Sequence, residues 1–230
     1  MLKKLFAGAL FAGLVAGLVA TVLQVTSMVP IILEAELYET GAKVHYAGAD
    51  IGAEDPGAEV EGDIVTNRNI LTFGMNLVTF VGFGLLMVVG FALAERAGYR
   101  IDWRAGLLWG AAGFAAFVVA PAGGLPPELP GAAAADLFAR QTWWIGTVIA
   151  TAVGIALIAF GGKPMHVAGA VVLIMLPQVI GAPQPEEYAG VVPPEMAGHF
   201  AARSVAVNAA TWAVLGAVAG LVWSRTPQNA

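Results

Sequence analysis

Long apolar runs without charged residues constrain this chain more than any other feature. A helix needs about 20 mostly apolar residues to cross the roughly 30 Å hydrocarbon core of a bilayer. The 230 residues are 58% hydrophobic and 12% charged, far from the usage of soluble domains. We therefore predict an all-α integral membrane protein, a single polytopic domain over residues 1–230 with about six transmembrane helices. The predicted spans are 5–29, 70–94, 105–121, 142–160, 165–182 and 203–223.

Small residues recur along these spans and predict close helix packing. Glycines four residues apart lie on one helix face, where they let two membrane helices approach each other. The pairs are Gly13 with Gly17, Gly106 with Gly110, and Gly216 with Gly220.

The first apolar run also has features of a secretory signal peptide, because Lys3 and Lys4 precede it. The run continues past Ala20 to Val29, longer than the apolar part of a usual signal peptide, and it has no clear cleavage site. We favour a membrane span, with a cleaved signal as the alternative.

The basic residues predict that both termini are cytoplasmic. Six spans put the termini on one side, and if that side is inside it holds seven of the eleven basic residues, the positive-inside pattern. The outer face then sums to -10 and the inner face to +5. An acidic face concentrates cations, although solvated loops often carry carboxylates without such a role. The aromatic residues expected at the membrane interfaces are Trp143 and Trp144 outside, and Trp103 and Trp223 inside.

The order of the spans allows three repeats of one helical hairpin. The outward-running spans end near proline, and the inward-running spans begin at Arg68, Arg140 and Arg203. Parallel repeats are a common way to build a transporter. The alternative is that each arginine only marks a membrane interface.

Polar residues spaced four apart form stripes on the predicted helices, such as Arg68, Thr72 and Asn76. Because lipid offers polar groups no partners, a stripe should face the bundle interior or a wet cavity. The alternative is that its hydroxyl groups bond to their own backbone. The residues predicted to line a transport path are Gln24, Arg68, Thr72, Asn76, Arg140, Gln178, Arg203 and Asn208.

Carboxylates and histidines in the outer loops are candidate ligands for a divalent metal. Carboxylate oxygens combined with imidazole suit Co, Ni or Zn. The spacing is not that of a strict metal motif, and acidic residues at helix starts are the alternative. The candidates are Glu34, Glu36, His45, Glu128, Glu195 and His199.

The segment 121–144 is the most unusual loop. Four prolines and three glycines surround Glu128, which excludes a continuous helix and predicts a tight, folded loop. We expect this loop to hold Glu128 inward, where Arg140 can neutralise it when no cation is bound.

The fifth predicted span contains a proline, Pro177, followed by Gln178. A proline frees a backbone carbonyl, and here an amide side chain stands beside it. Interrupted spans often mark a transport site, although a simple proline kink explains the pattern equally well.

Enzymatic and nucleic-acid functions find no support in the sequence. It contains no G-x-S-x-G, H-E-x-x-H, Walker or dinucleotide motif, and nothing pairs a nucleophile with a base. It has no cysteine, and its net charge of -5 offers nucleic acid no basic footprint. We predict a protein that is not an enzyme, binds no nucleic acid and holds no permanent cofactor.

Four segments are more distinctive than the apolar spans: MVPIILEAELYE, APAGGLPPELPGAAAADLFARQTWW, LPQVIGAPQPEE and FAARSVAVNAATWAVLG. Together they resemble the CbtA family of predicted cobalt transporter subunits. The likeness runs over nearly the whole chain, and the second segment is its most specific part. The resemblance implies a bacterial inner-membrane protein of cobalt uptake, partnered by a small CbtB-like subunit with a histidine-rich motif. Such proteins are usually described with about five spans, one fewer than the apolar runs predict.

Two functions therefore stay open. The first is a membrane subunit of an uptake transporter for a divalent metal, with cobalt as the transported ion. The second is a non-transporting structural or assembly subunit of a larger membrane complex, which the small-residue helix faces would suit.

Overall fold

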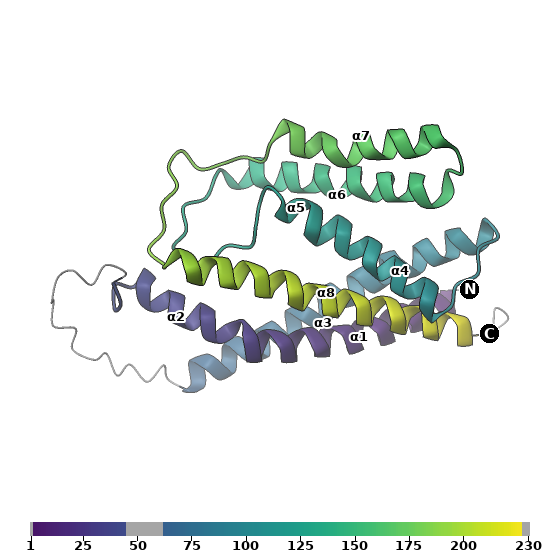
Figure 1. Cartoon of the computed structure of the whole chain (residues 1–230). Helices are drawn as coiled ribbons and strands as arrows, with labels where there is room; N and C mark the ends of the chain where they lie inside the picture. The colour runs from purple at the N-terminus through teal and green to yellow at the C-terminus, as the bar shows by residue number, and fades with distance from the viewer. Residues whose placement is uncertain (1, 45–61, 227–230) are drawn as a thin grey trace. The chain divides into compact units, whose positions relative to one another are not determined.

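The computed structural model describes residues 2–44 and 62–226, and most of these residues are helical (Figure 1). This confirms the all-α fold class. The elements are α1 (Leu2–Ser27), α2 (Val29–Glu39), α3 (Gly62–Arg96), α4 (Trp103–Phe114), a π-helix (Ala115–Val119), α5 (Ala120–Ala122), α6 (Leu137–Phe160), α7 (Pro164–Ile180) and α8 (Pro194–Arg225).

Within residues 2–44 and 62–226, five stretches of helix are long and apolar enough to cross a membrane, and α7 is a shorter apolar helix of 17 residues. About six spans are therefore consistent with the structure. The five stretches are Leu5–Ser27, Thr66–Arg96, Trp103–Ala122, Leu137–Phe160 and Pro194–Arg225.

Three helices begin earlier than the apolar runs predicted. α3 starts at Gly62 instead of residue 70, α6 at Leu137 instead of 142, and α8 at Pro194 instead of 203. Hydropathy measures only the part of a helix that would lie in hydrocarbon, whereas the backbone hydrogen bonds continue through polar turns. At 35 residues and 1.5 Å per residue, α3 is about 52 Å long, well beyond the thickness of the hydrocarbon core.

The first predicted span, 5–29, extends two residues past the end of α1, and a second helix follows almost at once. α1 ends at Ser27, and α2 begins at Val29 with Pro30 in its first turn. A proline is tolerated there because the first N–H groups of a helix have no intrahelical partner. The acidic segment after the first span is thus helical.

A π-helix lies at the end of the predicted third span. Residues Ala115–Val119 form it, and the amide of Ala120 donates to the carbonyl of Ala115, five residues earlier. Pro121 follows directly, and its missing N–H explains why the regular α pattern does not resume for long. The chain leaves the helix after Ala122, as predicted.

The chain divides into two compact units. In the described residues, the first unit consists of 2–27, 62–111 and 206–226, and the second of 28–44 and 112–205. Arg68 belongs to the first unit, whereas Arg140 and Arg203 belong to the second. The single polytopic domain and the three hairpin repeats stay predictions.

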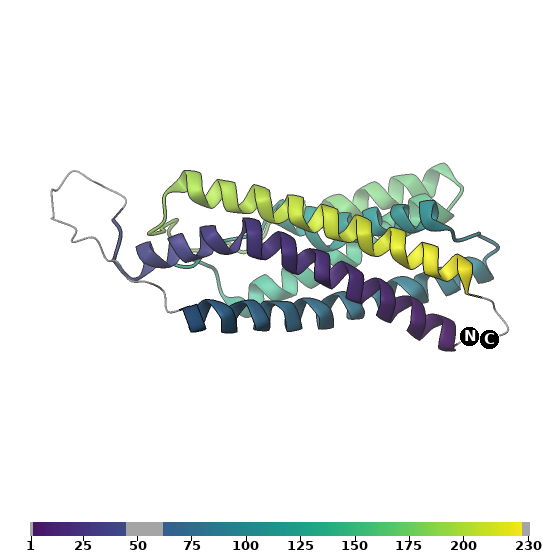
Figure 2. The same cartoon turned by 90° about the horizontal axis from the view of Figure 1, so that it is seen from below.

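In the first unit, α1 and α3 lie side by side and antiparallel (Figure 2). Gly13 faces the backbone at Val81, and Gly17 faces the backbone at Asn76 and Leu77. A side chain at Gly13 would overlap that backbone, so the two helices approach as closely as glycine allows. The predicted role of this glycine pair is confirmed.

The other two glycine pairs meet each other. Gly106 and Gly110 of α4 lie against Gly216 and Gly220 of α8, and a Cβ atom at any of the four would overlap backbone of the facing helix. These contacts lie within the first unit. Both pairs therefore form the predicted close crossing, with glycine on each side.

The interface role predicted for Trp223 is wrong. Its side chain is 2% exposed, and its indole N–H donates to the Glu95 carboxylate at 2.7 Å. The ring also packs edge-on against Phe91. A tryptophan near a helix end can thus be an internal contact, which hydropathy alone does not distinguish from a belt position. Trp103, by contrast, is exposed, and its place at the inner interface stays a prediction.

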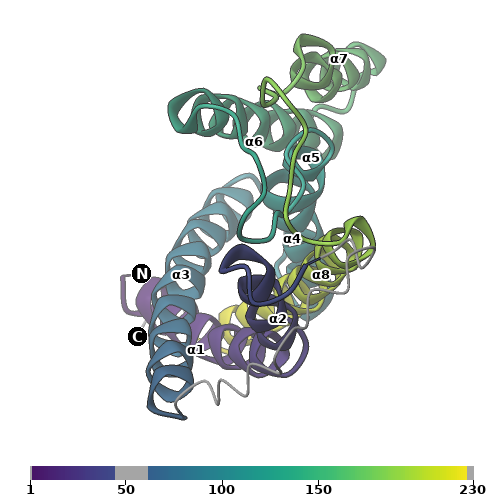
Figure 3. The same ribbon diagram turned by 90° about the vertical axis from the view of Figure 1, so that its left-hand side faces the viewer.

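In the second unit, α6 and α7 form a tight hairpin in which Gly154 of α6 packs against Ala170 and Ile174 of α7. At the end of this hairpin that lies away from the turn between α6 and α7, the loop after α5 and the loop after α7 lie beside one another (Figure 3). Ala132 and Gly190 form an antiparallel bridge, and the amide of Ala133 donates to the carbonyl of Ala189 at 2.8 Å. The proline-rich segment is therefore folded, as predicted.

Candidate functional site

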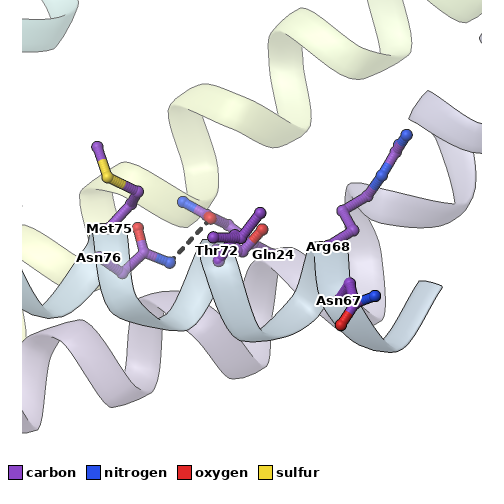
Figure 4. Close-up of a pocket in the computed structure, with 7 residues that line it drawn as sticks. Gln24, Asn67, Arg68, Thr72, Met75 and Asn76 are labelled. Atoms are coloured by element: carbon purple, nitrogen blue, oxygen red, sulfur yellow. Dashed lines mark hydrogen bonds between the residues drawn. The ribbon is translucent and has the colours of Figure 1, made fainter. Parts of the chain in front are cut away.

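An open hollow of about 610 Å³ lies in the first unit, between the end of α1 and the start of α3 (Figure 4). Four of the residues predicted to line a transport path meet here: one from α1 and three from one face of α3. The lining residues are Gln24, Asn67, Arg68, Leu71, Thr72, Met75 and Asn76.

Helical periodicity explains the α3 side of the hollow. Arg68, Thr72 and Asn76 are spaced by four residues, so they follow one another along a single face of the helix. Figure 4 shows Gln24 of α1 next to Thr72 and Asn76 of α3. Arg68 lies one turn before Thr72 on the same helix. The predicted stripe therefore does face a hollow.

Asn76 joins the two helices at the hollow. It is 9% exposed, and its amide nitrogen donates to the Gln24 Oε1 atom at 3.0 Å and to the Thr21 Oγ1 atom at 3.1 Å. Thr21 in turn donates to the carbonyl of Gly17 at 2.8 Å. This network satisfies a buried amide and fixes the orientation of Gln24, because the Oε1 atom must face Asn76.

The second candidate site is the ion pair of Glu128 and Arg140 in the second unit. The Arg140 guanidinium donates to the Glu128 carboxylate at 2.8 Å, and the Arg140 and Glu128 side chains are 27% and 32% exposed respectively. Arg140 comes from the first turn of α6, and Glu128 from the proline-rich loop before it. The predicted pairing is confirmed, and Glu128 is held rather than free in solvent.

Two side-chain hydrogen bonds join α5, α6 and α7 near the start of the loop that carries Glu128. The side-chain amide of Gln178 donates to the carbonyl of Ala120 at 2.8 Å, and the Trp143 indole donates to the carbonyl of Pro177 at 3.0 Å. Each of these carbonyls also accepts a backbone amide, from Gly123 at Ala120 and from Gly181 at Pro177, so the two side chains add a second hydrogen bond at the ends of α5 and α7. Gln178 thus lies at a helix junction of the second unit, and its place on a transport path stays a prediction.

Of the other predicted metal ligands, those that the structure describes do not come together in a metal-binding cluster. Glu34 forms an exposed ion pair with Lys43 at 3.3 Å, and Glu195 lies in the first turn of α8, four residues before the exposed His199. Glu36 is in α2, and His45 lies outside the described residues. Across 2–44 and 62–226, no three His, Asp or Glu side chains are grouped so that they could hold a metal ion.

The remaining path residues, Arg203 and Asn208, lie along α8, with Arg203 exposed. Near them the hydroxyl group of Thr211 bonds to its own backbone, donating to the carbonyl of Val207 at 2.8 Å. Thr147 of α6 does the same with Trp143. Hydroxyl groups in membrane helices often satisfy themselves in this way, so they are weaker indicators of a path than amides.

Sequence reasoning missed Thr21, Asn67 and Met75. Thr21 precedes Gln24 by three residues, a spacing that places both on one face of α1. Asn67 directly precedes Arg68. The signal that could have found Thr21 is therefore a short polar pair inside an otherwise apolar helix.

A family model described as "Probable cobalt transporter subunit (CbtA)" matches residues 2–224 of the chain. No curated protein and no solved structure matches it significantly. The match covers both units and nearly every described residue, so the family assignment concerns the whole architecture.

Proposed function

Because this chain belongs to the CbtA family of probable cobalt transporter subunits, we propose that it takes up divalent metal, cobalt above all, across a bacterial inner membrane. The family is one of transporter subunits, which is not a class of enzymes. The observation that carries the proposal is the convergence of Gln24, Arg68, Thr72 and Asn76 on one hollow. We assign this hollow to the entrance of the transport path.

Transport would need a driving force, and the chain has no ATP-binding motif. The membrane potential is sufficient in principle, because one charge crossing 100 mV gains about 2.3 kcal/mol and a divalent ion about 4.6 kcal/mol. The acidic outer face, which sums to -10 in the proposed orientation, would raise the local cation concentration. We therefore propose cobalt as the transported ligand and not as a resident cofactor.

The outer loops would supply the first metal contact. Glu128 is the strongest candidate because the proline-rich loop positions it before a ligand arrives, and the metal would displace Arg140 from its carboxylate. Glu34, Glu36, His45, Glu195 and His199 are further candidates on the proposed outer face.

A family of subunits implies partners within a membrane complex, and a small histidine-rich, CbtB-like protein is the partner we propose. The second candidate function is a non-transporting assembly subunit. The glycine contacts between α4 and α8 favour this second function, because they are typical of permanent helix packing. However, these contacts lie within the first unit and do not explain the polar hollow between α1 and α3.

Uptake by the purified protein tests the proposed function. Proteoliposomes that contain the full chain should accumulate radioactive cobalt, and an inside-negative potassium diffusion potential should increase the rate because the ion carries two charges. Protein-free liposomes are the control. Cobalt retention equal to theirs, with and without the CbtB-like partner, would reject the transport role and favour the assembly role.

Labelling with an impermeant thiol reagent tests the orientation. The natural chain has no cysteine, so a single introduced cysteine is labelled without background. In intact spheroplasts we expect His45→Cys to react and Arg100→Cys to react only after the membrane is opened. The reverse pattern would place the termini outside and invert the proposed direction of transport.

A further inference from the structure

We propose that the chain between α7 and α8 positions Glu128 for the metal, with Gln178 of α7 as a positioning residue and not as part of the transport path. Residues 181–193, which we call the return loop, connect the two helices. The inference rests on the proposed function, in which Glu128 is the first metal contact. All of the contacts that support it lie within the second unit.

The end of α7 and the return loop hold the beginning of the proline-rich loop, residues 123–136. The side-chain amide of Gln178 donates to the carbonyl of Ala120 at 2.8 Å, and that of Gln184 donates to the carbonyl of Gly124 at 3.3 Å. Gly124 also lies against Ala182, because a Cβ atom at Gly124 would be only 2.6 Å from the Ala182 Cβ atom. The proline-rich loop is therefore held where it leaves α5.

The return loop also holds the proline-rich loop beyond Glu128. The amide of Ala133 donates to the carbonyl of Ala189 at 2.8 Å, beside the antiparallel bridge of the two loops. Gly131 has a φ of +79°, and a Cβ atom there would lie 2.6 Å from the Val191 Cγ2 atom. Glycine suits both this backbone conformation and so close a neighbour. The return loop thus contacts the proline-rich loop on both sides of Glu128.

Between these two sets of contacts the chain has little freedom. Three of the six residues 125–130 are prolines, whose rings fix φ. Leu129, next to Glu128, is 4% exposed, so a buried side chain holds the backbone on that side. Arg140 pairs with the carboxylate at 2.8 Å. The position of the Glu128 carboxylate is therefore set, before a metal arrives, by where the return loop holds the two ends of this short stretch.

The surroundings of Gln178 fit this role better than a place on a transport path. Its side chain is half-buried, and its Oε1 atom lies 3.2 Å from where a Cβ atom at Gly123 would stand. Both polar atoms of its amide thus face the end of α5 and the start of the proline-rich loop. Without the Gln178 donor, the carbonyl of Ala120 keeps its backbone bond from Gly123 at 3.3 Å. Loss of this side chain should therefore loosen the loop without unfolding the protein.

Equilibrium dialysis of the purified full-length protein with radioactive cobalt tests this inference. Gln178→Met keeps the length of the side chain and removes its hydrogen-bond donor. We expect it to raise the half-saturating cobalt concentration about threefold to tenfold, because the loop must then be ordered when the metal binds. Gln141→Met makes the same chemical change at an exposed position of α6 and should leave cobalt binding unchanged.

The Glu128→Gln background distinguishes positioning from a direct role. A residue that acts only through Glu128 has no further effect once that carboxylate is lost. Gln178→Met should therefore leave the weaker cobalt binding of Glu128→Gln unchanged. The same fold-change in both backgrounds would overturn the inference, because Gln178 would then act on its own or through general stability. Natural cobalt affinity in the single variant Gln178→Met would overturn it as well.

The contacts beyond Glu128 give a second test with its own control. Gly131→Ala places a Cβ atom against Val191 at a positive φ, so it should shift the loop and weaken cobalt binding, again only while Glu128 is present. Gly190→Ala changes the other loop of the same bridge, where the nearest neighbour of a Cβ atom would be the Ala132 Cα atom at 4.0 Å. This control should bind cobalt like the natural protein. Equal binding by the two variants would overturn the inference.

The proposed function can fail separately, because binding and uptake are measured apart. Cobalt binding that depends on Glu128 and Gln178 in this pattern, without uptake in proteoliposomes, would support the positioning role and reject the transport role. Cobalt uptake by the natural protein, together with cobalt binding that Gln178→Met leaves unchanged, would reject the positioning role and leave the transport role standing.

Discussion

Gly216→Leu should destabilise the protein strongly, because it forces apart two helices that touch through their backbones. Gly216 and Gly106 lie against each other where α8 crosses α4, and a Cβ atom at Gly216 would overlap the backbone of Gly106 and Gly110. Backbone atoms cannot rotate away as a flexible side chain can, so the two helices must separate. We expect a loss of about 3 kcal/mol or more, and a fall of about 6 °C or more in the thermal midpoint of the detergent-purified protein.

Gly82→Leu is the matched control, because a Cβ atom at Gly82 meets nothing within 4 Å. Leucine is also the better helix former, so this variant should be as stable as the natural protein or slightly more stable. Equal stability of the two variants would show that α4 and α8 are not in backbone contact in the folded protein.

The glycine pairs and the apolar spans were predictable because each is a local pattern. Residues four apart share a helix face whatever surrounds them, and an apolar run of about 20 residues has few alternatives to a membrane helix. Neither rule identifies the partner helix. The sequence therefore predicted that Gly106 and Gly216 would lie in close contacts, and the structure added that they face each other.

The polar turns at helix ends were not predictable in the same way. α2 and the early turns of α3 and α8 contain acidic or polar residues that hydropathy assigns to loops. Their helical state depends on continuation from a neighbouring turn and on a tolerated proline at the start, as with Pro30 and Pro194. The prediction for Trp223 was wrong for a related reason, because Trp223 contacts Glu95 and Phe91 of α3, which are far away in the sequence.

The candidate site was half predictable. The α3 stripe follows from helical spacing, but the participation of Gln24 depends on how α1 and α3 pack, and only the structure supplies the hydrogen bond from Asn76. The ion pair of Glu128 and Arg140 could be predicted because the two residues are only twelve apart in the sequence, one in the proline-rich loop and the other in the first turn of the helix that follows it. In contrast, the amide of Gln178 reaches Ala120 across the packing of α7 on α5, which no local pattern indicates.

Glu128→Gln should reduce cobalt uptake in proteoliposomes by at least about tenfold, the second large effect we expect. The substitution keeps the shape of the side chain and its place in the proline-rich loop, but it removes the negative charge that would bind a cation. The thermal midpoint should change little, because an ion pair whose Arg140 and Glu128 side chains are 27% and 32% exposed contributes about 1 kcal/mol at most. Initial rates over a range of cobalt concentrations measure the effect.

A substitution of Arg140 tests this prediction most sharply, because it should raise the apparent cobalt affinity, whereas Glu128→Gln should lower cobalt uptake. If the arginine competes with the metal for the carboxylate, Arg140→Gln frees Glu128 and should raise the apparent cobalt affinity. An exposed pair worth about 1 kcal/mol limits the gain to about fivefold. Glu186→Gln removes an exposed carboxylate from the neighbouring loop and should change neither quantity. If instead Glu128→Gln and Glu186→Gln both transport cobalt at the natural rate, the ion pair only closes the loop against α6, and the first metal contact must be sought elsewhere on the outer face.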